Sequence, residues 1–101
     1  MKNLTKEQRN FVKKILEIPS ADITNKALEY VNLSTFQREI VKLSSIDKLS
    51  EMQIIDYYNN RDNKIYERST IERAKKDAFE RMYAVWSNNY FISIITNSWA
   101  R

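Results

Sequence analysis

A short row of cations near the start of the chain is the clearest candidate for binding chemistry. Lys6, Arg9 and Lys13 follow one another at spacings of three and four residues, which places them on one side of a helix. Lys2 extends this row. Cations without interleaved acids can bind the phosphates of a nucleic acid or the carboxylates of an acidic partner. An ordinary solvated face is the alternative interpretation, because many charge runs are no more than that.

A second pair of cations, Arg73 and Lys76, lies on the polar face of an expected helix. The same face carries three acidic side chains, Glu72, Asp77 and Glu80. We predict a solvated structural helix in which Glu72 pairs with Lys76, because charges one turn apart stabilise a helix. The segment 51–82 is also arranged like a helix-turn-helix, although its connection is long and has no glycine. Contact of Arg73 and Lys76 with nucleic acid is therefore the alternative.

The end of the chain is uncharged and aromatic from residue 82 to residue 100. Burial in the core is the commonest fate of such a segment. Tyrosine and tryptophan also anchor protein interfaces, where lysine and glutamate are depleted, so this segment is a candidate surface for a protein partner or a second copy of the chain. The residues expected at that interface are Trp86, Tyr90, Phe91 and Trp99. We expect no membrane contact, because several asparagines would be costly in hydrocarbon.

The composition excludes most catalytic and cofactor chemistry. The chain has no histidine, no cysteine and no glycine. Their absence removes ordinary serine triads, thiolate nucleophiles, metal sites built on histidine or cysteine, P-loops and dinucleotide-binding turns. Ser45 and Lys48 have the spacing of a nucleophile and its base, but the rest of such an apparatus is missing. We expect a protein that is not an enzyme and has no catalytic residue, metal or cofactor.

Net charge and cysteine usage favour a cytoplasmic protein with an anionic partner. The formal net charge is +4, from 17 basic and 13 acidic side chains. The chain has no cysteine to indicate an oxidising compartment, and its N-terminus lacks the apolar run of a signal peptide. Twelve isoleucines, ten lysines and ten asparagines indicate an AT-rich coding sequence of the kind found in phages and mobile elements.

Capping boxes predict where the helices that position these residues begin. In such a box a serine or threonine is followed three residues later by glutamate or glutamine. Four are present: Thr5 with Gln8, Ser34 with Gln37, Ser50 with Gln53, and Ser69 with Glu72. Apolar residues at helical spacing then predict helices at 5–18, 21–31, 35–43 and 51–58, and a long helix from about residue 70. The sequence NNRDNK is expected to end the fourth helix.

The segment 90–99 is ambiguous, because its β-branched and aromatic residues suit a strand while its apolar spacing suits a helix. We favour a helix, since no other segment offers alternating residues to pair with a strand. The absence of glycine also disfavours hairpin turns. The fold is therefore predicted to be all-α, a compact bundle of five or six helices that forms a single domain over residues 1–101.

Two functions are compatible with these features. We expect a small binding protein, a phage or mobile-element effector that docks on and modulates a larger host protein, as an inhibitor or anti-defence factor. The basic row would assist if the target belongs to a nucleic-acid-handling complex. The alternative is a regulator that binds DNA or RNA directly, with the basic first helix and the 51–82 segment as its contacts.

Overall fold

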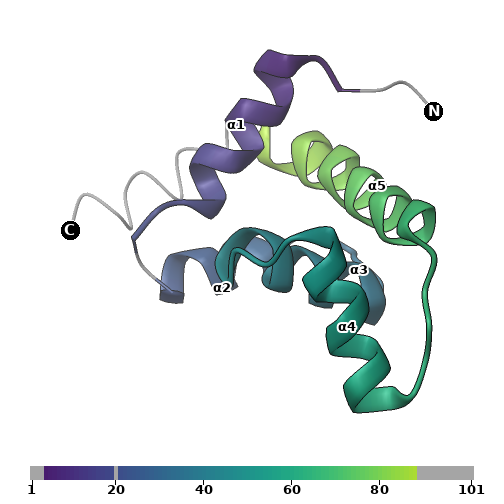
Figure 1. Ribbon diagram of the computed structural model, residues 1–101. Coiled ribbons are helices and arrows are strands. Elements are labelled where there is room, and N and C mark those ends of the chain that lie inside the picture. Colours follow the sequence, from purple (N-terminus) through teal and green to yellow (C-terminus); the bar gives the residue numbers. More distant parts are fainter. Residues whose placement is uncertain (1–3, 20, 89–101) are drawn as a thin grey trace. The chain divides into compact units, whose positions relative to one another are not determined.

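The computed structural model describes residues 4–19 and 21–88 (Figure 1). Over these residues it contains five α-helices, one π-helical turn and no strand, which confirms the all-α prediction. No described helix has the length and apolar character needed to cross a membrane. The elements are α1 (Lys6–Leu16), α2 (Ala21–Glu29), α3 (Thr35–Val41), the π-helical turn η1 (Lys42–Ile46), α4 (Glu51–Asp62) and α5 (Arg68–Trp86).

Three of the four predicted capping boxes are formed. Thr5, Ser34 and Ser50 each accept the backbone N–H of the glutamine three residues later, at 3.1, 3.1 and 3.2 Å. The glutamine side chains accept the N–H of the capping residues in return, at 2.9, 3.0 and 2.8 Å. These reciprocal bonds satisfy amides that have no partner within the helix, and they fix where α1, α3 and α4 begin.

The fourth predicted box, Ser69 with Glu72, is wrong. α5 begins at Arg68, so Ser69 lies inside its first turn. The carbonyl of Glu67 accepts the first backbone hydrogen bonds of this helix. Arg68 pairs with Glu51 and Glu72, and these ion pairs favour a helix that already includes Arg68.

The predicted end of the fourth helix is also wrong. α4 continues through the expected break and ends at Asp62. Arg61 in its last turn bonds to Glu39 of α3, a tertiary contact that outweighs the weak helix propensity of asparagine and aspartate. Asn63 then ends the helix in the left-handed conformation, with φ of 54°.

The third predicted helix, 35–43, consists of two parts. α3 ends at Val41, and the chain passes without a break into η1. The N–H of Asp47 donates to the carbonyl of Lys42, which is the wider spacing of a π-helix. Apolar periodicity over 35–43 does not reveal this widening, because only the last two residues of that segment, Lys42 and Leu43, belong to η1.

The chain divides into two compact units, and each is described by itself. Unit 1 comprises Met1–Asn32 and Phe79–Arg101. Its described part contains α1, α2 and residues 79–86 of α5. The rings of Phe11 and Tyr83 meet edge to face at 5.8 Å, a favourable arrangement for aromatic quadrupoles. The buried apolar residues of this unit are Val12, Leu16, Ala27, Leu28, Val31, Phe79, Met82 and Trp86.

Unit 2 comprises Leu33–Ala78, which contains α3, η1, α4 and residues 68–78 of α5. The ring of Tyr58 is almost fully buried and lies 5.6 Å from Phe36, 5.4 Å from Tyr57 and 5.1 Å from Tyr66. These tyrosines occupy α4 and the connection to α5, so the aromatic contacts hold that connection against α3 and α4. The buried core cluster of this unit is Ile40, Leu43, Ile54, Tyr58 and Ile71.

Two left-handed residues in a chain without glycine lead to a stability prediction. Lys48 has φ of 59° and Asn63 has φ of 54°. A left-handed backbone costs about 1–2 kcal/mol for most residues, whereas asparagine tolerates it and glycine adopts it freely. We expect Lys48→Gly to raise the free energy of unfolding by about 1 kcal/mol, and Asn63→Gly to raise it by less. Urea denaturation measures both changes.

The matched control is Lys42→Gly, because Lys42 has a right-handed φ of −63°. Glycine there should lower the free energy of unfolding by about 1 kcal/mol, through the added freedom of the unfolded chain. If Lys48→Gly is as destabilising as Lys42→Gly, Lys48 does not adopt the left-handed conformation in solution.

Candidate functional site

The predicted basic row lies on α1 in unit 1. The Thr5 cap makes Lys6 the first residue of this helix, and Arg9 and Lys13 follow on its next two turns. All three side chains are exposed. No ion pair to any of them is formed within residues 4–19 and 21–88, so their charges remain uncompensated by the described part of the chain. The row is therefore a positive surface that is open to an external anion.

The dimensions of this row follow from helix geometry. With a rise of about 1.5 Å per residue, Lys6 and Lys13 are about 10 Å apart along the helix axis, and the three cations lie within an arc of about 60°. Val12 is buried about 60° around the axis from Arg9, and Leu16 is buried two turns beyond Arg9 on nearly the same side of α1. The apolar side packs the helix into unit 1, so the row is presented by a fixed element.

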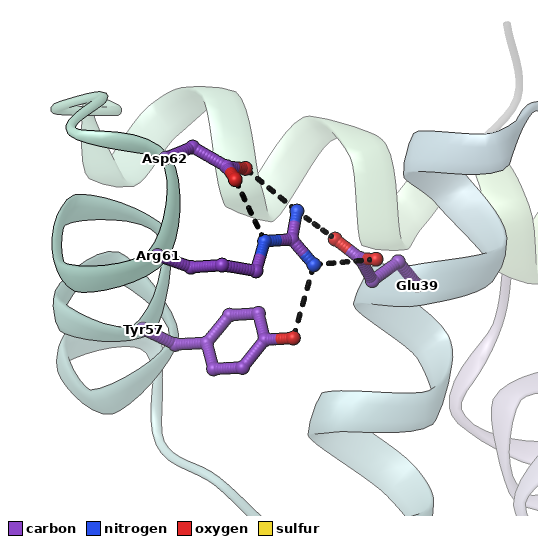
Figure 2. Close-up of polar contacts among 4 residues, drawn as sticks. All are labelled: Glu39, Tyr57, Arg61 and Asp62. Atoms are coloured by element: carbon purple, nitrogen blue, oxygen red, sulfur yellow. Dashed lines mark hydrogen bonds and ion pairs between the residues drawn. The ribbon is translucent and has the colours of Figure 1, made fainter.

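Arg61 of α4 is the centre of a polar cluster in unit 2 (Figure 2). Its Nη1 and Nη2 atoms each donate to one oxygen of Glu39, at 3.0 Å. Its Nε and Nη2 atoms donate to the two oxygens of Asp62, at 2.8 and 2.6 Å. Nη1 also donates to the hydroxyl of Tyr57 at 3.0 Å. A guanidinium has five N–H donors, and all five are used in these bonds.

The guanidinium of Arg61 also lies over aromatic rings, 5.0 Å from the centre of Tyr57 and 5.2 Å from that of Tyr58. Both ring contacts are within the range of a cation–π interaction. With its donors used and two carboxylates beside it, Arg61 has no N–H left for a phosphate or a carboxylate of a partner. Its role is to join the last turn of α4 to Glu39 of α3.

The acid–base properties of the cluster follow from these contacts. The hydrogen bonds from Arg61, followed by the hydroxyl of Tyr58, hold the pKa of Glu39 below its ordinary value of 4.5. Arg61 likewise lowers the pKa of Asp62. Burial and then the carboxylate of Glu39 raise the pKa of Tyr58. The carboxylates of Asp62 and Glu39 raise the pKa of Arg61, so the cluster keeps its charges at neutral pH.

Arg68 is neutralised in a similar way at the start of α5. Its Nε atom bonds to Glu51 and lies 3.2 Å from Glu72. Glu72 thus pairs with Arg68, and the predicted pair with Lys76 is not formed in the described structure. In a helix-turn-helix the first turn of the second helix faces the bases. Here that turn carries an arginine whose charge is already balanced by carboxylates.

Arg73 and Lys76 are exposed on α5 within unit 2, as expected for its polar face. Neither takes part in an ion pair within the described residues. They belong to unit 2, whereas α1 belongs to unit 1. Their contact with nucleic acid stays a prediction.

Trp86 does not lie on an exposed surface, which corrects the expectation for this residue. Its side chain is fully buried in unit 1, and its Nε1 atom donates to the carbonyl of Ala27 at 3.1 Å. Arg81 donates to the carbonyl of Asn32 at 2.7 Å. Two side chains of α5 thus bond to carbonyls at and beyond the end of α2, and the carbonyl of Ala27 also accepts the N–H of Tyr30. The other expected interface residues, Tyr90, Phe91 and Trp99, lie outside the described residues.

The sequence holds a signal for the buried position of Trp86, because it extends the apolar face of α5 in register with Ala78 and Met82. Its hydrogen bond to Ala27 joins residues 59 positions apart in the chain, and helical periodicity carries no information on such a pairing.

The described residues offer little that resembles a catalytic or metal centre. Ser45 lies in η1, whereas Lys48 follows it outside the helix in the left-handed conformation, so the two do not share a helical turn. No group of three or more acidic, histidine or cysteine residues in the described chain is arranged to hold a metal ion. Comparisons with protein-family models, curated proteins and solved structures find no match.

The lowered pKa values in the Arg61 cluster predict how stability depends on pH. A carboxylate whose pKa is lower in the folded state stabilises the fold above its unfolded pKa, and this stabilisation is lost as pH falls through the folded pKa. We therefore expect the free energy of unfolding to decrease from about pH 5 to about pH 3. In Arg61→Gln this slope should be shallower, because Glu39 and Asp62 lose the cation that lowers their pKa.

Urea denaturation across this pH range measures the slope. Arg73→Gln is the matched control, since Arg73 is exposed and has no ion pair in the described structure. An Arg61→Gln slope equal to those of the wild type and the control would show that the cluster does not form in solution.

The buried hydrogen bond of Trp86 predicts a large effect of a conservative substitution. Trp86→Phe keeps an aromatic ring but removes the N–H that Ala27 accepts, and it leaves a cavity. We expect the free energy of unfolding to fall by about 2–4 kcal/mol, measured by urea denaturation. The control Arg81→Gln removes the bond to the exposed residue Asn32 and should cost under about 1 kcal/mol. Equal effects of the two variants would contradict a buried Trp86.

Proposed function

We propose that this protein works by binding, and that it docks on a larger protein of its host through the basic row of α1. The observation that carries this proposal is the contrast among its exposed cations. Arg61 and Arg68 are balanced by carboxylates, and Arg81 is bonded to a carbonyl. Lys6, Arg9 and Lys13 have no such partner in the described chain.

The distribution of charge supports the same surface. Unit 1 holds eight basic and five acidic side chains, whereas unit 2 holds nine and eight. Unit 1, which contains α1, thus has a net charge of +3, and unit 2 has a net charge of +1. An uncompensated positive surface speeds encounter with an acidic partner and selects against basic ones. This is the behaviour expected of a docking surface on a small protein.

The proposed role is that of an effector which modulates its target, as an inhibitor or anti-defence factor encoded by a phage or mobile element. The basis for this origin is the richness in isoleucine, lysine and asparagine. We propose a target in a complex that handles nucleic acid. The basic row would assist docking there by pairing with acidic groups of the target. Tyr90, Phe91 and Trp99 are proposed as a second, aromatic part of the same interface or of a homodimer interface.

Direct binding of DNA or RNA is the second candidate, favoured by the same unpaired row on α1. Each phosphate that the protein neutralises releases counterions, so the logarithm of affinity falls with the logarithm of salt concentration. Three cations give a slope of about −3 at most on duplex DNA, which corresponds to weak binding without sequence preference. Arg61 and Arg68 are neutralised and add nothing to this slope, whereas the exposed Arg73 and Lys76 of unit 2 remain available to a nucleic acid. The protein partner is our first candidate because binding through the row alone would be weak.

A charge-reversal variant tests the proposal. We expect Lys6→Glu, Arg9→Glu and Lys13→Glu together to reduce capture of the host partner from lysate at least tenfold, because three attractive contacts become repulsive. The matched control reverses Lys14, Lys26 and Lys64, which are also exposed lysines. The control has the same net charge and should retain the partner. Quantitative mass spectrometry of the captured proteins measures both.

Two results would redirect the proposal. Equal capture by the wild type and the α1 variant would move the interface away from α1, and loss of capture in Trp99→Ala would then place it on the aromatic end of the chain. Tight binding of purified protein to duplex DNA, with a salt slope that the α1 variant abolishes, would favour the nucleic-acid candidate.

A further inference from the structure

The positive charge of Lys6 is unfavourable at its position, which is the start of α1. Lys6 is the first residue of α1, directly after the Thr5 cap. The amino end of a helix carries a partial positive charge, so a cation in the first turn is unfavourable, whereas a cation in the last turn is favourable. Glu7 is the acidic residue of this turn. No ion pair of Lys6 is formed in the described structure, so no specific contact offsets this effect.

A residue that opposes a local preference without an internal contact to offset it is typical of a functional position. Lys13 and Lys14 show the opposite case, since both lie in the last turn of α1, where the helix dipole favours them. Of the three cations of the row, Lys6 is thus the one whose charge α1 itself disfavours.

The surroundings of the row limit the kind of anion that fits it. Glu7 lies on α1 about 100° from Lys6 around the axis, and Glu17 lies at the C-cap beyond Lys13. A stiff polyanion that followed the helix, such as duplex DNA, would approach these carboxylates, whereas a flexible acidic chain can turn away from them. A short segment with two or three carboxylates fits the length of about 10 Å between Lys6 and Lys13. Arg9, between them, can bind one carboxylate through two parallel N–H···O bonds.

We infer that the α1 row docks on a short acidic segment of a partner protein, and that Lys6 is kept for this contact although it destabilises α1. This inference rests on the proposed function and adds the chemistry of the partner. If Lys6 were only a structural residue, a substitution there would change stability and binding in the same direction. Removing the charge of Lys6 should make the protein more stable and its binding weaker.

The predicted effect on stability is tested with Lys6→Glu in the full chain, and Lys14→Glu is the control on the same helix. An acid in the first turn is favourable, so we expect the Tm of Lys6→Glu to rise by about 2–6 °C. The control replaces a favourable cation in the last turn and should lower the Tm. A Tm of Lys6→Glu at or below that of the wild type would overturn the inference.

The predicted effect on binding is tested with poly-L-glutamate as the probe. Binding is measured at constant salt from the chemical-shift changes of the α1 amides. We expect Lys6→Glu to weaken this binding about five- to tenfold and Lys14→Glu by less than about twofold. Arg9→Lys keeps the charge but loses the paired bonds, and should weaken it about threefold. Duplex DNA at equal charge concentration is the second probe, and tighter binding to DNA than to poly-L-glutamate would overturn the acidic-protein partner.

Failure of this inference is distinguishable from failure of the proposed function. If the triple α1 variant still captures the host partner, the proposed function fails whatever Lys6→Glu shows. If the triple variant loses the partner while Lys6→Glu keeps it and binds poly-L-glutamate normally, the docking surface stands and the role of Lys6 is overturned.

Discussion

The contacts of Arg61 with two carboxylates are the interaction that sets the end of α4 in unit 2. They connect Glu39 of α3 to the last turn of α4 and extend that helix through residues of weak propensity. The extension determines where the chain leaves α4, at Asn63, and therefore how Tyr66 reaches the aromatic cluster around Tyr58. A lysine could not replace Arg61, because a single ammonium cannot bind two carboxylates in the paired geometry of a guanidinium.

Ion pairs within the protein determine which cations are available to bind a partner. Arg61 and Arg68 are next to carboxylates, and the charge that each would present to a polyanion is largely cancelled. Unit 1, which contains α1, accounts for +3 of the formal charge of +4, and unit 2 accounts for +1. The partner that we propose for the row on α1 is a short acidic segment, whereas affinity for a long nucleic acid would depend on how many free cations reach its phosphates.

In unit 1 the end of α5 completes the end of α2. Trp86 and Arg81 donate to the carbonyls of Ala27 and Asn32, at and beyond the end of α2. An aromatic residue expected to bind a partner is thus a buried part of unit 1, and its N–H has a hydrogen-bond partner inside the protein. The row on α1 is independent of this contact, since its cations are on the exposed side of another helix.

The sequence by itself determined the all-α class, three helix starts and the exposed row on α1. Each of these depends on residues within one or two turns of each other, such as Thr5 with Gln8 or Lys6 with Arg9. Only the tertiary structure decided the length of α4, the start of α5 and the hydrogen-bond partner of Trp86. Those features depend on Arg61 with Glu39, Arg68 with Glu51 and Trp86 with Ala27, pairs that are 22, 17 and 59 residues apart. Local propensity and periodicity do not specify which distant residues will meet, because that depends on how whole helices pack.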